Sequence, residues 1–416
     1  MEKFIVEGKR PLTGSVKIHG AKNAVLPILA ATVISGRQSV IYDCPDLSDV
    51  SESLKILEFL GCSTKREGSV VTVKSESIIT DIIPEQLMLK MRSSIIFLGA
   101  LAARLKSATI TLPGGCEIGP RPIDLHLKAF RQMGMIIDES CGEIYCDAKN
   151  LHSADIHLDF PSVGATENVM LAACGAQGIT TISNAAKEPE IEDLQKFLNS
   201  MGARVTGAGT NTIYIEGAKV YNDVTHTVIP DRIETATYIA AVLITGGDAL
   251  LTNVEPAHIQ ALLSVLNETG AELILKGDTL RVASPNRLLA VKRVRTYPYP
   301  GFPTDMQSIF MSLMTTAQGT CVIAENIFHD RFRQVDGLLR MGADIVVDGQ
   351  LAVVKGTPTL YGAHVSAADL RGGAALTVAA LGAQGTSEIE NVCYIDRGYE
   401  RFEDNLRLLG ADIQRR

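Results

Sequence analysis

The chain has 416 residues, of which 46% are hydrophobic and 5% aromatic, and its formal net charge is -8. This length predicts two or three domains, and the acidic balance argues against a protein that binds nucleic acid or an anionic membrane surface. The eight cysteines form no CxxC pair, which predicts reduced thiols without a disulfide framework. The first residues, MEKFIVEGKRPLTG, lack a signal-peptide core, and the longest apolar run, AVLPILAATVIS, is too short to cross a bilayer. We therefore expect a soluble cytoplasmic protein.

One pattern recurs six times along the chain, with a period of roughly 70 residues. Each time, an amphipathic helix is expected to end at a hydrophobic residue followed by glycine. The glycines are Gly61, Gly134, Gly202, Gly270, Gly342 and Gly410. Glycine suits a helix end because a left-handed backbone costs it no steric strain. In five of the six cases a hairpin-like alternation follows, as in ARVTGAGTNTIYIEG.

A second helix in each repeat is apolar on nearly every face, which predicts that it is buried. The six segments are LPILAATVI, IIFLGALAA, NVMLAA, YIAAVLI, IFMSLM and LTVAAL. A solenoid is the alternative reading of a regular period, but common solenoid repeats have about 20–50 residues. We therefore expect an α/β protein with two closed domains, each with three buried helices inside its sheets. The predicted domains are 21–229, and 1–20 together with 230–416, in which FIVEG supplies strands that the truncated last hairpin lacks.

A polar or glycine-rich junction precedes each buried helix, and a second polar segment follows the next strand in five repeats. Because these segments occupy matching positions in the repeat, we expect them to cluster. They supply the cations Lys22, Arg92, Arg121, Arg232, Arg331, Arg371 and Arg397. A cationic cleft in an acidic protein predicts a small anionic substrate that carries phosphate or carboxylate groups. Asp231, Glu234 and Asp369 fit helix caps or ion pairs as well as they fit a functional role.

The stretch TLPGGCEIGPRPIDLHL places Cys116 between paired glycines and a Gly-Pro-Arg-Pro run. A free cysteine is usually a small buried hydrophobic residue, and we interpret the other seven in this way. Cys116 differs because its loop favours exposure and because Arg121 would favour the thiolate, which predicts a nucleophile or an acid. His126, in a predicted helix further along, either orients the loop or contacts a phosphate.

Asp305, in PGFPTDMQS, is predicted to face the cationic cleft. A carboxylate in such a cleft suits a general base, or an acceptor for a hydroxyl, better than a ligand for an anion. The sequence has no HExxH, no Hx3H, no cysteine cluster, no GxGxxG after a strand and no GxxxxGK loop. We therefore expect neither a metal nor a cofactor.

Seven segments resemble the UDP-N-acetylglucosamine enolpyruvyl transferase family: GAKNAVLP, PGGCEIGPRPIDLH, PSVGATEN, PDRIETATY, PGFPTDMQ, ENIF and DRGYERF. The resemblance covers the whole chain, and it implies the two-domain inside-out α/β barrel of the enolpyruvyl transferase fold. It also implies transfer of the enolpyruvyl group of phosphoenolpyruvate to the 3′-hydroxyl of UDP-N-acetylglucosamine, with release of phosphate. That reaction is the first committed step of peptidoglycan synthesis, and so serves cell-wall biogenesis, cell shape and cell division.

The resemblance implies residue roles as well. Cys116 would protonate the methylene carbon, can add to phosphoenolpyruvate covalently, and would be the residue that fosfomycin alkylates. Asp305 would take the proton of the 3′-hydroxyl. Lys22 and Asn23 would hold phosphoenolpyruvate, with Arg121 and Arg397 on its phosphate and carboxylate. The UDP-sugar would be held by Arg92, Arg121, Pro122, Ile123, Asp124, Leu125, Ser162, Val163 and Gly164, with Ile327 and Asp305 at the sugar. Arg331 and Arg371 complete the predicted substrate site.

The sequence departs from the family pattern at two places. Some members have a lysine just before Ser-Val-Gly, where this chain has Phe160 and Pro161, so one diphosphate contact is left open. Some also have a tryptophan near the Arg92 motif, and this chain has none. The alternatives are the related shikimate-phosphate enolpyruvyl transferase, which lacks the cysteine loop, and a non-catalytic UDP-sugar-binding paralogue. The presence of Lys22, Cys116, Asp305 and Arg397 argues against the paralogue.

Overall fold

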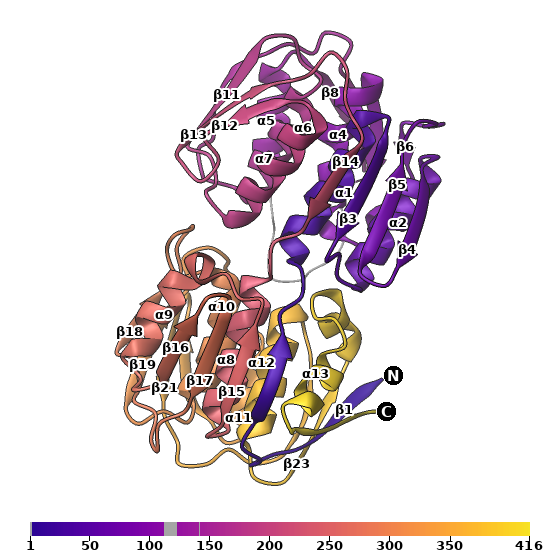
Figure 1. Ribbon diagram of the computed structural model, residues 1–416. Helices are drawn as coiled ribbons and strands as arrows, with labels where there is room; N and C mark the ends of the chain where they lie inside the picture. The colour runs from indigo at the N-terminus through magenta and orange to yellow at the C-terminus, as the bar shows by residue number, and fades with distance from the viewer. Residues whose placement is uncertain (1, 112–122, 141) are drawn as a thin grey trace. The chain divides into compact units, whose positions relative to one another are not determined.

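The computed structural model describes residues 2–111, 123–140 and 142–416 (Figure 1). The chain divides into two compact units. The N-terminal unit holds the described residues from Gly20 to Ile229. The C-terminal unit holds the residues up to His19 together with Pro230–Arg416. The chain therefore passes between the units at His19–Gly20 and again at Ile229–Pro230.

The N-terminal unit has three four-stranded sheets, with the orders β14-β3-β5-β4, β6-β7-β9-β8 and β10-β11-β13-β12 among the described residues. Their strands are β3 (Gln38–Tyr42), β4 (Ser63–Glu67), β5 (Val70–Lys74), β6 (Ile82–Ile83), β7 (Ser107–Thr111), β8 (Ile136–Ser140), β9 (Glu143–Asp147), β10 (Asp155–His157), β11 (Ile179–Ser183), β12 (Arg204–Thr206), β13 (Thr212–Glu216) and β14 (Val224–Thr227).

The C-terminal unit also has three four-stranded sheets, with the orders β2-β15-β17-β16, β18-β19-β21-β20 and β22-β23-β1-β24 in the part of the chain that the structure describes. Their strands are β1 (Lys3–Glu7), β2 (Thr13–Lys17), β15 (Asp248–Thr252), β16 (Glu272–Lys276), β17 (Thr279–Ala283), β18 (Arg293–Arg295), β19 (Thr320–Ala324), β20 (Asp344–Asp348), β21 (Leu351–Lys355), β22 (His364–Ser366), β23 (Thr386–Glu390) and β24 (Asp412–Arg415).

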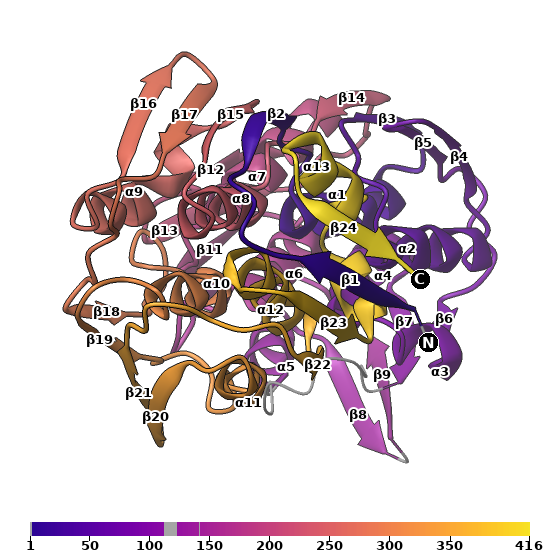
Figure 2. The ribbon, with the colours of Figure 1, turned by 90° about the horizontal axis from the view of Figure 1, so that it is seen from below.

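All six sheets share one topology. The first strand in each order is parallel to the second, and the remaining neighbours are antiparallel. In the last repeat β1 lies between β23 and β24 and pairs with both, as Figure 2 shows. The N-terminal strand therefore supplies what the last hairpin lacks, which confirms the prediction for FIVEG.

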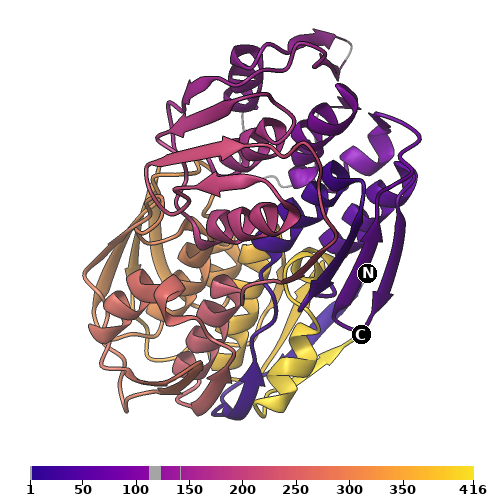
Figure 3. The same cartoon turned by 45° about the horizontal axis from the view of Figure 1, so that its top comes forward.

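Three buried helices pack together in each unit. The N-terminal unit has α1 (Lys22–Ser35), α4 (Phe97–Leu105) and α6 (Val163–Ala173), and the C-terminal unit has α8 (Arg232–Ile244), α10 (Thr304–Met314) and α12 (Leu370–Gly382). Every residue of α1 except Asn23 is buried. The three helices of each unit contact one another, and their sheets surround them (Figure 3). Each fully buried Leu or Ile contributes about 1.5–3 kcal/mol, so these aliphatic helices form the cores.

Amphipathic helices and short helical turns connect the strands. They are α2 (Ser48–Phe59), α3 (Glu85–Met88), η1 (Arg92–Ile96), α5 (Asp124–Gln132), α7 (Pro189–Met201), η2 (Pro256–Ile259), α9 (Gln260–Asn267), α11 (Val335–Arg340), η3 (Val392–Arg397) and α13 (Phe402–Leu408). The six repeat glycines lie just beyond α2, α5, α7, α9, α11 and α13, with φ between +81° and +120°. A side chain would strain the backbone there, so the predicted helix ends are confirmed.

The cysteines agree with the sequence interpretation except at one position. Cys44, Cys62, Cys146, Cys174 and Cys321 are buried, but Cys393 is exposed. The prediction that Cys393 is a core residue was wrong because η3 buries Val392 and Ile395 instead. Cys116 and Cys141 lie outside the described residues. None of the described helices has both the length and the apolar composition to span a membrane.

Candidate functional site

Asp305 lies between two arginines in the C-terminal unit. It is the second residue of α10, and its side chain is 26% exposed. One carboxylate oxygen, Oδ1, is 2.5 Å from Nη2 of Arg331, and the other, Oδ2, is 3.5 Å from Nη2 of Arg371. Two guanidinium groups favour the ionised carboxylate, which can accept a proton and bind a hydroxyl but would repel an anion.

Both arginines are buried, and each has one nitrogen without a hydrogen-bond partner in the described part of the chain. Arg331 and Arg371 are each 3% exposed. The buried atoms Arg331 Nε and Arg371 Nη1 have no hydrogen-bond partner among the described residues. A buried donor without a partner is costly. Both atoms are shielded from solvent, so the role of this pair at an anion site stays a prediction.

The guanidinium of Arg371 is held from the other side by an aromatic ring. Arg371 lies over the ring of Tyr399 at 5.5 Å, and the Tyr399 hydroxyl is 2.8 Å from Oγ1 of Thr237. Burial alone would lower the pKa of Arg371, but interactions with Tyr399 and Asp305 outweigh it and raise the pKa. Arg371 therefore stays charged although it is buried.

The acidic residues that the sequence left open between two roles are now assigned. Asp231 accepts hydrogen bonds from the backbone of Ile233 and Glu234, and Asp369 accepts them from Arg371 and Gly372, so both are helix N-caps.

Glu234 instead accepts from the backbone and the ring of His19, at 2.8 and 2.9 Å. Burial lowers the pKa of His19, but the hydrogen bond and charge of Glu234 outweigh it, so the pKa is raised. Glu234 is therefore the ion-pair partner of His19, the last residue of the N-terminal segment that belongs to the C-terminal unit.

In the N-terminal unit, Lys22 is the first residue of α1 and only 8% exposed. Its Nζ lies 2.7 Å from Oδ2 of Asp49 on α2. Asp49 did not appear among the predicted site residues. The signal was available, because residues 44–52 occupy in the first repeat the place of the polar segments that we identified in the other five.

Six of the residues predicted to hold the UDP-sugar lie at the starts of two helices, α5 and α6, which contact each other. Ile123, Asp124 and Leu125 begin α5, and Ser162, Val163 and Gly164 begin α6. Ser162 caps α6 by accepting from the backbone of Ala165 at 3.3 Å. Free N–H groups at a helix start favour a phosphate group.

A buried His–Asn pair joins these helix starts to a third segment. Nδ2 of Asn168 lies 3.0 Å from Nδ1 of His126 and donates to the carbonyl of Ile95, while Oδ1 accepts from Gly99. Burial lowers the pKa of His126 to about 4. The imidazole is therefore neutral near pH 7 and connects α5 with α6 and η1. Of the two roles expected for His126, this geometry favours orientation.

The remaining predicted residues are not all brought together. Arg92 begins η1, Asn23 is half-buried in α1, Ile327 is half-buried after β19, and Arg397 ends η3. Cys116, Arg121 and Pro122 lie outside the described residues. The structure thus groups Asp305, Arg331 and Arg371 in one unit and the two helix starts in the other.

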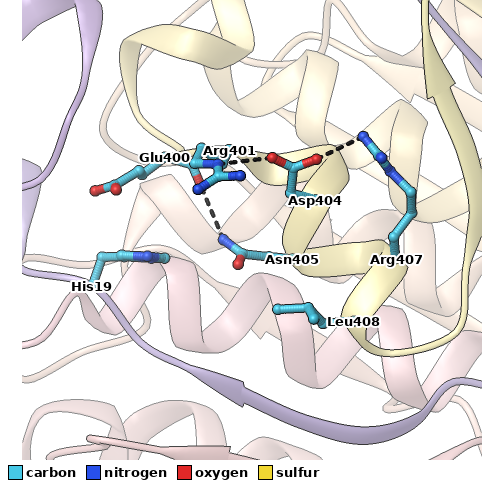
Figure 4. A pocket seen from close by; sticks show the side chains of 7 residues that line it. All are labelled: His19, Glu400, Arg401, Asp404, Asn405, Arg407 and Leu408. Atoms are coloured by element: carbon cyan, nitrogen blue, oxygen red, sulfur yellow. Dashed lines mark hydrogen bonds and ion pairs between the residues drawn. The ribbon is translucent and has the colours of Figure 1, made fainter.

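A separate cavity of about 410 Å³ lies in the C-terminal unit (Figure 4). It is lined by His19, Glu400, Arg401, Asp404, Asn405, Arg407 and Leu408. Arg401 and Arg407 both pair with Asp404, at 2.7 and 2.6 Å. This lining includes none of the predicted site residues, so we do not place the chemistry there.

Metal-binding side chains do not gather in the part of the chain that the structure describes: no three His, Cys, Asp or Glu residues are grouped as a metal ion would need. The expectation that neither a metal nor a cofactor takes part stays a prediction.

Comparison with known sequences gives a consistent result. A sequence model of the family EPSP synthase (3-phosphoshikimate 1-carboxyvinyltransferase) matches residues 6–406. The chain is 51% identical to UDP-N-acetylglucosamine 1-carboxyvinyltransferase 2 of Caldanaerobacter subterraneus subsp. tengcongensis, with 100% of both chains covered. It is 48% identical to UDP-N-acetylglucosamine 1-carboxyvinyltransferase 1 of Carboxydothermus hydrogenoformans, covering 100% of this chain and 98% of the relative.

Comparison with solved structures concerns the fold alone. The enolpyruvyl transferase NikO from Streptomyces tendae has a TM-score of 0.90 at 23% identity, covering 100% of this chain and 98% of that one. An EPSP synthase from Acinetobacter baumannii has a TM-score of 0.77 at 17% identity, covering 100% of both chains. These likenesses confirm the predicted enolpyruvyl transferase fold, an inside-out α/β barrel of six repeated units around buried helices.

Proposed function

The chain belongs to the EPSP synthase family of enolpyruvyl transferases, and on this premise we propose that it transfers the enolpyruvyl group of phosphoenolpyruvate to the 3′-hydroxyl of UDP-N-acetylglucosamine. The observation that carries the proposal is full-length identity of 46–51% to relatives named for that substrate. The geometry of Asp305, a partly exposed carboxylate paired with two buried arginines, fits a group that accepts a proton from the sugar hydroxyl.

The proposed reaction forms one bond at C2 of phosphoenolpyruvate and later breaks another. The 3′-oxygen of the sugar attacks C2 while Asp305 takes the hydroxyl proton and Cys116 gives a proton to C3. The tetrahedral product then loses a proton from C3 and its phosphate from C2, which restores the double bond and leaves an enol ether. Cationic groups contribute by orienting the reactants and by stabilising charge as phosphate departs.

The substrate-binding residues are assigned by the motifs that resemble the family. Lys22, Asn23, Arg121 and Arg397 hold phosphoenolpyruvate, and the helix starts at Ile123–Leu125 and Ser162–Gly164, with Arg92 and Pro122, hold the UDP-sugar. Arg331 and Arg371 fix Asp305 and keep positive charge beside it. Ile327 and Asp305 face the sugar.

The proposal extends to the role in the cell. The reaction commits UDP-N-acetylglucosamine to peptidoglycan, so the protein acts in cell-wall biogenesis, cell shape and cell division, and its substrates place it in the cytoplasm. Fosfomycin is expected to inactivate it by alkylating Cys116.

A phosphate-release assay on the purified protein tests the proposal. We expect release only when phosphoenolpyruvate and UDP-N-acetylglucosamine are both present. Turnover of shikimate 3-phosphate instead would identify the related transferase, and UDP-sugar binding without turnover would identify a non-catalytic paralogue.

A further inference from the structure

Glu325 is a fully buried acid that follows β19, with an exposed fraction of 0%. Its carboxylate accepts four hydrogen bonds. Oε1 accepts from the hydroxyl of Thr296 at 2.9 Å and from the backbone N–H groups of Ile327 and Phe328 at 2.9 and 3.1 Å. Oε2 accepts from the hydroxyl of Thr304 at 3.0 Å. Burying a carboxylate is costly unless donors surround it, and here the donors come from three separate segments.

The repeat shows that only part of this arrangement is shared structure. The residue that follows the second strand of a sheet is Asp43, Asn184, Asn253 or Asn391 in four other repeats, each with φ between +50° and +59°. Three of them tie the neighbouring parallel strand: Asn184 donates to Leu158, Asn253 to Ile18 and Asn391 to Ser366.

Glu325 keeps that tie through Thr296, which follows the neighbouring strand β18, but it differs in two respects. It lacks the left-handed backbone of the described equivalents. It also reaches two further places, the first residue of α10 and the loop at Ile327. In three other repeats, asparagine at this position is sufficient to bind the neighbouring parallel strand. The additional contacts of Glu325 with Thr304 and Ile327 therefore need a separate explanation.

The contacts of Glu325 close a ring around Asp305. Thr304, which donates to Glu325, directly precedes Asp305. Asp305 binds Arg331, and the Arg331 guanidinium lies 5.8 Å from the ring centre of Phe328. The backbone of Phe328 returns to Glu325. Movement of the Glu325 carboxylate would therefore shift both the acid at position 305 and the backbone at 327.

We propose that Glu325 is a positioning residue for the sugar acceptor, whose buried carboxylate sets the distance between the Asp305 carboxylate and the Ile327 backbone. The inference rests on the proposed function, because it assigns the sugar to those two residues. Glu325 touches no substrate itself and acts through Thr304, Ile327 and Phe328. Small errors in the placement of reacting groups can cost roughly 100-fold in rate, so such a residue has kinetic consequences.

The test compares Glu325→Asn with the wild type in steady-state kinetics on both substrates. Asparagine restores the residue type of the equivalent repeats but is too short to hold α10 and the Ile327 loop together. We expect KM for UDP-N-acetylglucosamine to rise and kcat to fall, with kcat/KM for that substrate reduced roughly 10- to 100-fold, while KM for phosphoenolpyruvate changes little. Thr304→Val, which removes the hydroxyl that joins α10 to Glu325, should give a smaller change of the same kind if Glu325→Asn does not fold.

The matched control is Asn253→Ala, which removes the equivalent tie in another repeat. It should lower the melting temperature and leave KM for both substrates unchanged. Wild-type kinetics in folded Glu325→Asn, or in Thr304→Val, would overturn the inference and make Glu325 a purely structural residue. If the wild-type protein itself did not turn over UDP-N-acetylglucosamine, the proposed function would fall and this inference with it.

Discussion

The Nη2 atom of Arg331 lies 2.5 Å from Oδ1 of Asp305, and both side chains belong to the C-terminal unit. The arginine is 3% exposed, whereas the acid is 26% exposed. The buried guanidinium therefore holds a carboxylate whose face is open to a ligand. The pair combines a fixed orientation with a negative charge that a second arginine, Arg371, also stabilises.

Replacing Asp305 with asparagine should remove the proton acceptor and keep the shape of the side chain. General-base groups contribute typically 10²–10⁴-fold, so we expect kcat to fall by at least about 100-fold. Phosphate release at saturating concentrations of both substrates is the measurement. Asp336→Asn is the control, since Asp336 is an exposed acid in the first turn of α11, and it should be fully active. A variant at 305 with more than a tenth of wild-type kcat would exclude the base role.

Fosfomycin should modify Cys116 and leave the other thiols intact. Burial raises the pKa of Cys62 to about 11 and that of Cys146, Cys174 and Cys321 to about 12, so these thiols carry little reactive thiolate. Cys393 is the exposed thiol among the described cysteines and so the informative competitor.

Peptide mapping by mass spectrometry after fosfomycin treatment locates the adduct. Cys393→Ser should be inactivated at the wild-type rate, whereas Cys116→Ala should take up no adduct and release phosphate far more slowly. An adduct on Cys393 in the wild type would refute the assignment of Cys116 as the activated thiol.

The repeat predicted the fold because its signals are local. A glycine just after a helix and a helix without a polar face determine where a helix ends and what it buries, and all six copies agree. The closure by β1 followed because the last repeat visibly lacked strands.

The sequence predicted which residues belong to the site but not which of their side chains contact one another. Matching positions in the repeat indicated that Asp305 and Arg371 lie at equivalent helix starts, but their pairing depends on side-chain reach that no spacing encodes. Asp49 was missed because we omitted the first copy of the polar segment. The ring of contacts at Glu325 joins residues 296, 304 and 328, and only tertiary packing brings these together.

The buried His126 makes a specific pH dependence expected. Burial lowers its pKa from 6.5 to about 4. Above pH 6.5 the imidazole is neutral in the folded and the unfolded states. Between pH 6.5 and 4, His126 binds a proton in the unfolded chain but not in the folded chain. The free energy of unfolding therefore decreases as the pH falls. The free energy of unfolding should drop by about 2 kcal/mol from pH 7.5 to pH 5 through this group.

Urea unfolding of the wild type and His126→Gln at the two pH values isolates this effect. Glutamine does not titrate, so the variant should lose less stability on acidification than the wild type. The wild type must be compared with the variant because Glu167 also titrates. Burial raises the pKa of Glu167, so this carboxyl increases the free energy of unfolding as the pH falls, whereas His126 decreases it. Equal pH dependence in both proteins would show that His126 is not held neutral.

Lys128 should supply part of the positive charge near the diphosphate of the UDP-sugar, which the uncharged Phe160 cannot supply. Phe160 and Pro161 stand in the region where the family resemblance leads us to expect a lysine, and Phe160 is 44% exposed. Lys128 on α5 has its Nζ 2.5 Å from Oδ2 of Asp159, the residue just before Phe160. Both charges are solvent-exposed, and contacts of this kind contribute less than about 1 kcal/mol.

Lys128→Met should therefore raise KM for UDP-N-acetylglucosamine roughly two- to five-fold at low salt, with kcat unchanged. Asp159→Asn should lower this KM, because it removes a negative charge three residues before the helix start at Ser162. Phe160→Lys in the Lys128→Met background should restore binding. Lys149→Met serves as the control because Lys149 is an exposed lysine that pairs with Asp147. An unchanged KM in Lys128→Met, or equal shifts in both lysine variants, would mean that the diphosphate is held without this side chain, by the helix start and the arginines alone.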